Sequence, residues 1–241
     1  MAIIAVQLVV AAAPPGLWPD VATLQYEGML TVNEVFHSIQ GESSQAGLPC
    51  VFVRLTACDL RCAWCDTPYA FHEGRKRDVA DVLAEVASYG CRLVEVTGGE
   101  PLLQPDVYPL LQGLLDAGHD VLVETGGHIS IERVPAGVAR IMDIKCPGSG
   151  EAAKMCWDNL ARLRANDEVK FVIANRADYD YAKTVMQRGD WASRVAAILF
   201  SPVHGQLPPA DLAAWVLADR LPVRVQLQVH KYIWAPGTRG V

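Results

Sequence analysis

Three cysteines, Cys58, Cys62 and Cys65, stand within eight residues in the stretch LTACDLRCAWCDTPYAF, directly after an apolar run. Thiolates are soft ligands, and a Cys-x3-Cys-x2-Cys spacing can wrap three of them around one centre on a short loop. A structural zinc ion normally takes four ligands, so zinc would need a fourth, such as His72 or Cys91. A 4Fe-4S cluster held by three cysteines would instead leave one iron free for a non-protein ligand.

Composition limits the class of protein in which this cysteine motif occurs. The chain has 241 residues, of which 20% are charged and 51% hydrophobic, which is typical of one globular domain with a substantial core. A net charge of −6 provides no overall basic surface for nucleic acid, so we expect a small-molecule partner. Seven unevenly spaced cysteines do not suggest a closed disulfide scaffold, and a reducing, cytoplasmic location fits better.

The first 28 residues differ from the rest. Their apolar run resembles the middle of a signal peptide but lacks the preceding positive charges, and it is too short to span a bilayer. Three interpretations remain open: a mispredicted start upstream of Met29, a genuine N-terminal extension, and an export signal. We expect one folded domain to cover residues 29–241, without a membrane anchor.

The segments that must position the cysteines alternate between two patterns. Short runs rich in β-branched residues predict strands at residues 50–57, 92–97, 120–125, 138–144, 168–173, 195–200 and 223–229. Helical periods follow a potential cap at Asp78, with Val79, Val82, Leu83 and Val86, and follow Pro105. This alternation predicts an α/β fold with a parallel sheet covered by helices.

Glycines and polar residues gather just past several of these strands. They occur in TGGEP (97–101), ETGG (124–127), DIKCPGSG (143–150), SPVHG (201–205) and QVHKY (228–232). Any one of these loops could simply be a turn. Because ligands bind at the carboxyl edge of parallel sheets and barrels, five such loops together predict a shared site.

The cysteine motif, with Trp64 before its last cysteine, resembles the cluster motif of radical S-adenosylmethionine enzymes. In that superfamily the free iron chelates S-adenosylmethionine, whose reductive cleavage produces a 5′-deoxyadenosyl radical, and TGGEP is similar to its glycine-rich loop. The resemblance implies cofactor contacts from the residues flanking the last cysteine, from the glycine loop and from two later loops: Trp64, Cys65, Asp66, Gly98, Gly99, Glu124, Lys145 and Cys146. Glu100 either joins them or holds its loop by accepting backbone hydrogen bonds.

Within that superfamily, the chain from Met29 onward resembles the 7-carboxy-7-deazaguanine synthase family. EVFHSIQGE (34–42), CDTPYA (65–70) and QVHKYIW (228–234) carry the resemblance, and DIKCPGSGE and SPVHG also fit. It implies a partial, shortened (β/α) barrel, a homodimer and an external electron donor such as flavodoxin. The implied reaction converts 6-carboxy-5,6,7,8-tetrahydropterin to 7-carboxy-7-deazaguanine with loss of ammonia, using Mg2+ and regenerated S-adenosylmethionine, in queuosine or deazapurine biosynthesis.

The same resemblance implies the residues for substrate and Mg2+. Arg54, within an apolar run, offers a forked donor that suits a carboxylate, although a solvent-facing role is the alternative. Thr67 is the implied Mg2+ ligand, with a turn or capping role as its alternative. The remaining substrate residues are Ile39, Gln40, Gly41, Thr97, Ser201, Pro202, Val203 and His204, while His230 and Lys231 could be structural or functional. The sequence singles out no side chain for later proton transfers.

Two other functions remain open at this point. A glycyl-radical-enzyme activase would use the same cysteine spacing but would act on a protein partner, and it gives no reason for SIQGE or QVHKY. A zinc-stabilised binding module would be colourless and free of sulfide.

Overall fold

The computed structural model describes residues 26–241. The three interpretations of the N-terminal segment therefore concern residues that lie almost entirely outside this range. The described residues just before Met29 make contacts with the body of the protein: the Tyr26 hydroxyl donates to Asp116, and the Gly28 carbonyl accepts from the Val79 amide at 3.0 Å. Packing contacts thus begin slightly before Met29.

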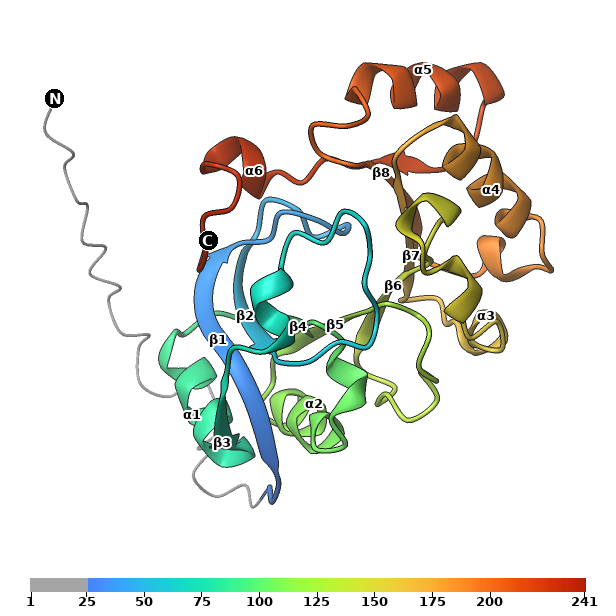
Figure 1. Ribbon diagram of the computed structural model, residues 1–241. Coiled ribbons are helices and arrows are strands. Elements are labelled where there is room, and N and C mark those ends of the chain that lie inside the picture. The colour runs from blue at the N-terminus through green and yellow to red at the C-terminus, as the bar shows by residue number, and fades with distance from the viewer. Residues whose placement is uncertain (1–25) are drawn as a thin grey trace, which may run out of the picture.

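In the described part of the chain, nine strands form a single sheet with the order β3-β1-β2-β4-β5-β6-β7-β8-β9. All strand pairs from β2 to β9 are parallel, whereas β1 is antiparallel to both β2 and β3. The two edge strands, β3 and β9, do not pair, so the curved sheet is a partial barrel (Figure 1), as expected from the sequence. The strands are β1 (Met29–Ile39), β2 (Pro49–Leu55), β3 (Arg75–Asp78), β4 (Leu93–Gly98), β5 (Asp120–Thr125), β6 (Ala139–Asp143), β7 (Glu168–Ile173), β8 (Ala197–Pro202) and β9 (Arg224–Val225).

Six of the seven predicted strands occupy their expected places within about two residues. The prediction at 223–229 is wrong beyond β9, because the chain leaves the sheet after Val225 and a short helix begins at His230. Two strands were not predicted. β1 interrupts its apolar residues with Asn33, Glu34 and His37, and β3 consists of RKRD at a sheet edge, where charged residues are common.

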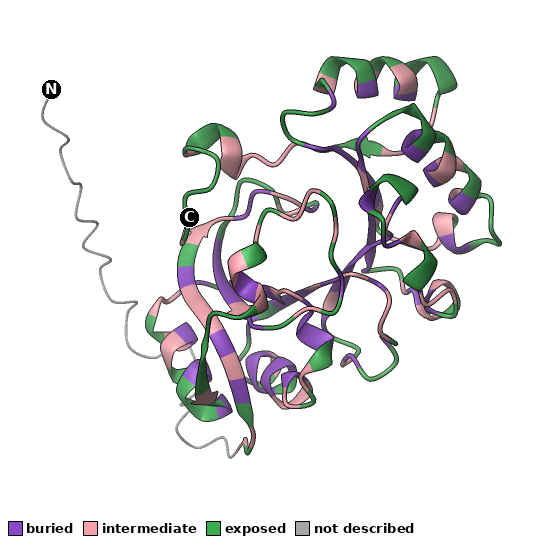
Figure 2. Ribbon diagram, viewed as in Figure 1, coloured by how far each residue is buried: buried purple, intermediate pink, exposed green. Residues whose placement is uncertain are grey.

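Helices cover the outer face of the sheet (Figure 1). The predicted period after Asp78 forms the first of them, and its four apolar residues are at most 2% exposed, although Asp78 makes no side-chain capping bond. Figure 2 shows the four longer helices buried on the side that faces the sheet, whereas the helix at His230–Ile233 has no buried residue. The α-helices are α1 (Val79–Ser88), α2 (Val107–Asp116), α3 (Asn159–Arg162), α4 (Arg176–Met186), α5 (Pro209–Asp219) and α6 (His230–Ile233), and 3-10 turns cover Pro68–Phe71, Pro101–Leu103, Pro147–Ser149, Ala152–Lys154 and Trp191–Ser193.

Alternate residues of β2 divide between two apolar clusters. Val51, Val53 and Leu55 of β2 join the large cluster under the helices, whereas Cys50 and Phe52 belong to a smaller cluster on the concave face. Burial of each large aliphatic side chain contributes about 1.5–3 kcal/mol, so both clusters stabilise the curved sheet. Among the described residues, no helix is long and apolar enough to span a membrane.

Candidate active site

A cavity of about 710 Å³ opens at the carboxyl ends of the parallel strands. All five of the predicted loops contribute to its wall, together with the cysteine loop that follows β2. Of the residues predicted from the sequence, the lining contains Ile39, Gln40, Gly41, Arg54, Cys58, Cys62, Trp64, Cys65, Asp66, Thr67, Thr97, Gly98, Gly99, Glu124, Lys145, Val203 and His204.

Three predicted residues lie behind this wall. Cys146 is 1% exposed, and its sulfur lies 3.9 Å from the Asp178 carbonyl. Ser201 and Pro202 are buried at the end of β8, just before the lining residue Val203. The fold therefore places the side chains of these three residues outside the cavity lining.

The cysteine loop is held in place by hydrogen bonds from its backbone amides to the segment after β6. The Arg61 amide donates to Oε1 of Glu151 at 2.8 Å, and the Ala63 amide donates to the Ser149 carbonyl at 3.0 Å. Within the loop, the Cys65 amide donates to the Cys62 carbonyl at 3.1 Å. These bonds fix the loop without using the three thiols, which leaves the sulfurs available as ligands.

Two glycines let the TGGEP loop pack directly against the start of the cysteine loop. Gly98 has φ of +151°, and a Cβ there would lie 2.2 Å from the Leu55 carbonyl oxygen. At Gly99, a Cβ would lie 2.2 Å from the Ala57 carbonyl oxygen and 2.7 Å from Cβ of Cys58. Side chains would push the two loops apart, so glycine is required at both positions.

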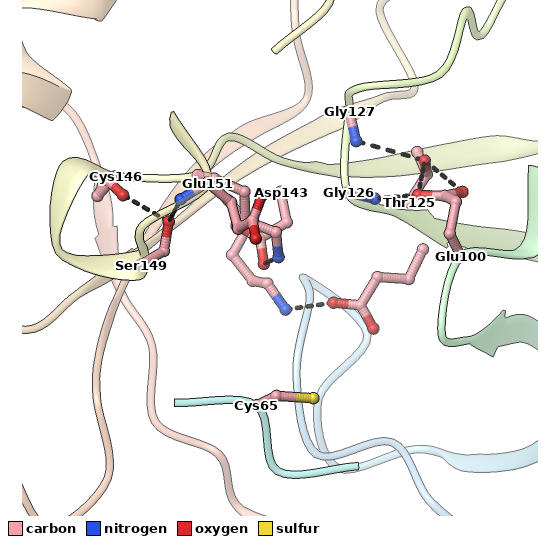
Figure 3. A network of polar contacts seen from close by, with 12 residues as sticks. Cys65, Glu100, Thr125, Gly126, Gly127, Asp143, Cys146, Ser149 and Glu151 are labelled. Atoms are coloured by element: carbon pink, nitrogen blue, oxygen red, sulfur yellow. Dashed lines mark hydrogen bonds and ion pairs between the residues drawn. The ribbon is translucent and has the colours of Figure 1, made fainter. Parts of the chain in front are cut away.

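Glu100 ties the ends of two strands together. Its Oε1 accepts from the Leu102 amide at 3.0 Å, and its Oε2 accepts from the Gly126 amide at 2.8 Å. The Thr125 hydroxyl also donates to this carboxylate at 2.8 Å (Figure 3). At 1% exposure and with these bonds, Glu100 holds its loop in place, which was one of the two alternatives for this residue.

The three cysteines suit a cluster better than a single ion. Among the described residues, no group of three or more Cys, His, Asp or Glu side chains could hold one metal ion. In a 4Fe-4S cluster each cysteine binds a different iron, so the sulfurs need not converge on one point. Burial raises the pKa of the Cys58 and Cys62 thiols above its ordinary value, which favours protonated thiols until a metal displaces the proton.

A buried ion network forms another part of the cavity wall. Nζ of Lys170 on β7 forms ion pairs with Glu124 of β5 and with Glu42, the latter at 2.8 Å. Burial alone would lower the pKa of Lys170, but these two carboxylates raise it well above its ordinary value. The Thr97 hydroxyl donates to Glu124 at 3.4 Å. Ion pairs and one hydroxyl hydrogen bond thus connect β4, β5 and β7 of the partial barrel.

A second ion network lies beside the cysteine loop. Lys231 Nζ lies 2.8 Å from Oδ2 of Asp66, which also accepts from Gln228 at 3.2 Å. Burial alone would raise the pKa of Asp66, but Lys231 and Gln228 lower it to about 2. His230 packs against Gly41, where a Cβ would lie 2.1 Å from Nδ1 of the imidazole. The C-terminal QVHKY segment therefore connects SIQGE to the residue after the last cysteine.

Several lining residues were not predicted. Glu42, Glu95 and Lys170 carry ionisable side chains and line the cavity, although the last two stand in the apolar strands LVEVTG and EVKFVI. The signal that marked Arg54, an ionisable residue between two apolar neighbours in an apolar run, would have found Glu95 and Lys170. Glu42 stands inside the quoted SIQGE motif but was not assigned a role.

Comparison with known proteins places these features in context. Residues 53–139 match the Radical SAM superfamily. The chain is 45% identical over 226 residues to the 7-carboxy-7-deazaguanine synthase of Koribacter versatilis, covering 88% of this chain and 100% of that protein. It is 47% identical over 219 residues to the enzyme of that name from Chlorobaculum tepidum, covering 89% of this chain and 99% of that protein.

Solved structures agree with the fold. QueE from Escherichia coli superposes with a TM-score of 0.70 at 23% identity, covering 84% of this chain and 95% of the other. SuiB from Streptococcus suis, bound to S-adenosylmethionine, superposes with a TM-score of 0.50 at 11% identity, covering 71% of this chain and 45% of the other. At these identities the superpositions support a shared fold.

Proposed function

The chain belongs to the 7-carboxy-7-deazaguanine synthase family of radical S-adenosylmethionine enzymes, and from this premise we propose the reaction that it catalyses. It converts 6-carboxy-5,6,7,8-tetrahydropterin to 7-carboxy-7-deazaguanine with loss of ammonia. The observation that carries this proposal is the identity to synthases over essentially their whole length. The cavity supports it, because the three cysteines and the SIQG segment line the same space.

The family's cofactors fit the cavity. Cys58, Cys62 and Cys65 would hold a 4Fe-4S cluster, and the wall beside them provides Trp64, Asp66, Gly98, Gly99, Glu124 and Lys145 for S-adenosylmethionine. When bound, the cluster and S-adenosylmethionine would supply the chemistry that removes a hydrogen atom from the substrate. Lys145 is held by Asp143 at 2.7 Å, so its ammonium group is positioned before any ligand binds. Cys146 would contribute only through its backbone, since its side chain is buried.

The substrate would lie against Ile39, Gln40 and Gly41, between the two ion networks. We propose that Arg54 binds its carboxylate, because the guanidinium lies on the cavity wall and only its Nε is engaged by Glu34 among the described residues. Thr97, Val203 and His204 line the same space, and Ser201 and Pro202 would act by placing the Val203–His204 loop.

Thr67 is the proposed protein ligand of Mg2+. Its hydroxyl lies 4.0 Å from the sulfur of Cys65, at the point where the cysteine loop meets the cavity. Mg2+ prefers oxygen ligands and keeps several waters, so one hydroxyl and one substrate carboxylate form a suitable set.

The family resemblance also supports a homodimer, an external electron donor such as flavodoxin, and a cytoplasmic location as parts of this proposal. The proposed catalytic domain covers residues 29–241. It is the range within which every lining residue of the cavity falls.

Anaerobic turnover tests the proposed function. The reconstituted protein, a reductant, S-adenosylmethionine, Mg2+ and the carboxytetrahydropterin should give 7-carboxy-7-deazaguanine, detected by chromatography with mass spectrometry. Omission of reductant or of S-adenosylmethionine should abolish the product. Cleavage of S-adenosylmethionine with the pterin left unchanged would contradict the proposal, and a glycyl-radical activase would behave in that way.

A further inference from the structure

Glu95 carries a buried carboxyl group and stands between apolar residues on the concave face of the partial barrel. In the register of the sheet it stands between Phe52 of β2 and Leu122 of β5, both members of the apolar cluster on the concave face. The residue is 4% exposed and lines the cavity. An acidic group in such surroundings is costly unless it is paired or neutral, so its presence calls for a function.

The hydrogen bonds around Glu95 give its two oxygens different roles. The Glu42 amide donates to Oε1 of Gln40 at 3.0 Å, which fixes the orientation of the Gln40 side-chain amide. Nε2 of Gln40 therefore points to Oε2 of Glu95 and donates to it. Among the described residues, Oε1 of Glu95 has no hydrogen-bond partner. If the group carries a proton, that proton belongs on Oε1.

The charges that face Glu95 favour the protonated form. Glu42 comes from the segment after β1 and Glu124 from β5, and both carboxylates already pair with the buried ammonium group of Lys170 on β7. The thiol of Cys50 on β2 also interacts electrostatically with Glu95, and the imidazole of His230 on α6 interacts with Glu42 and Glu124. Burial, followed by the charges of Glu124 and Glu42, raises the pKa of Glu95 to about 8.

Resting on the function proposed above, we propose that Glu95 recognises the substrate as a neutral carboxylic acid. Its Oε1–H donates a hydrogen bond to an acceptor atom of the pterin heterocycle, a carbonyl oxygen or a ring nitrogen, while Oε2 stays on Gln40. The proton remains on Glu95 throughout, so the residue selects and orients the ring and takes no part in bond breaking.

Two substitutions separate this role from its alternatives. Glu95→Gln keeps one donor and one acceptor in nearly the same shape, whereas Glu95→Leu removes both and resembles the neighbouring apolar residues. Affinity for the carboxytetrahydropterin is measured by anaerobic calorimetry, and the melting temperature is measured alongside. We expect Glu95→Gln to bind within about threefold of wild type and Glu95→Leu to bind about tenfold more weakly or worse. Glu95→Leu should melt at the wild-type temperature or above.

The pH dependence provides a further measurement. Glu95 is neutral below its raised pKa and ionised above it, so wild-type affinity should fall as the pH rises through about 8. Glutamine cannot ionise, so the affinity of Glu95→Gln for the pterin should not show this fall.

Three results would overturn the inference. Glu95→Leu binding as tightly as wild type would show that the residue does not contact the substrate, and a lower melting temperature with that result would show a structural role. Glu95→Gln binding as weakly as Glu95→Leu would show that an ionised carboxylate is needed. Wild-type protein that neither binds nor converts the pterin would overturn the proposed function itself. Failure of the inference about Glu95 and failure of the proposed function therefore give different results.

Discussion

Nε of Arg54 lies 2.7 Å from Oε1 of Glu34, and this ion pair joins β2 to β1 beside the cavity. The Tyr69 hydroxyl donates to the same oxygen at 3.0 Å, so Glu34 holds the base of the guanidinium and leaves its terminal nitrogens for a ligand. Both side chains of the pair are at most 20% exposed. Arg54 is thereby fixed in position for the substrate carboxylate that we propose it binds.

This arrangement predicts the behaviour of Arg54→Lys. Lysine keeps the charge but loses the forked donor, so KM for the pterin should rise about tenfold or more while kcat falls less. Arg77→Lys is the matched control, because Arg77 is equally buried but pairs with Glu85 away from the cavity lining. A KM unchanged by Arg54→Lys would argue against the carboxylate role.

We expect cluster binding to depend on the three cysteines of the motif. Cys58→Ala, Cys62→Ala and Cys65→Ala should each lose the visible absorption and most of the iron of the reconstituted protein, since a thiolate ligand is removed. Cys156→Ala serves as the control, because Cys156 is a half-buried cysteine outside the cavity lining and should retain about four irons per chain. Full iron content in any one of the three motif variants would show that the cluster lies elsewhere.

Thr67 is expected to set the response to Mg2+. Thr67→Ala should lower turnover and weaken its dependence on Mg2+, while the cluster and the reductive cleavage of S-adenosylmethionine stay largely intact. Thr67→Ser, which retains the hydroxyl, should restore the Mg2+ response. A Mg2+ titration of Thr67→Ala that matches wild type would instead favour the turn or capping role.

A variant beginning at Met29 should stay soluble and active. It lacks the hydrogen bonds of the Tyr26 hydroxyl and of the Gly28 carbonyl, so unfolding in urea should show a loss of about 1–2 kcal/mol relative to the full chain. Failure to fold would show that residues before Met29 belong to the domain.

The sequence predicted most of the parallel strands because their β-branched runs are buried on both faces. It did not predict β1, since one face of that strand borders the cavity and carries polar residues such as Glu34 within an otherwise apolar pattern. The prediction of a strand over residues 223–229 was wrong beyond Val225, because the alternation of apolar and polar residues in VRVQLQV does not reveal where the chain leaves the sheet.

The site could be predicted where a motif marked it, as at the cysteines and the glycine loop. Lys170 and Glu95 lacked such a motif, and their importance depends on which carboxylates the curved sheet brings next to them. Cys146 was predicted from its loop, but only Lys145 of that pair lines the cavity, while the Cys146 side chain is buried in the core. Position in a ligand loop does not determine where a side chain points.

The central claim is ring contraction of the pterin, and turnover of substrate deuterated at the carbon that bears the carboxylate tests it most directly. The claim predicts 7-carboxy-7-deazaguanine and ammonia in equal amounts, with deuterium appearing in the 5′-deoxyadenosyl group of the S-adenosylmethionine pool. Recovery of unchanged deuterated substrate, while S-adenosylmethionine is cleaved without deuterium incorporation, would contradict it.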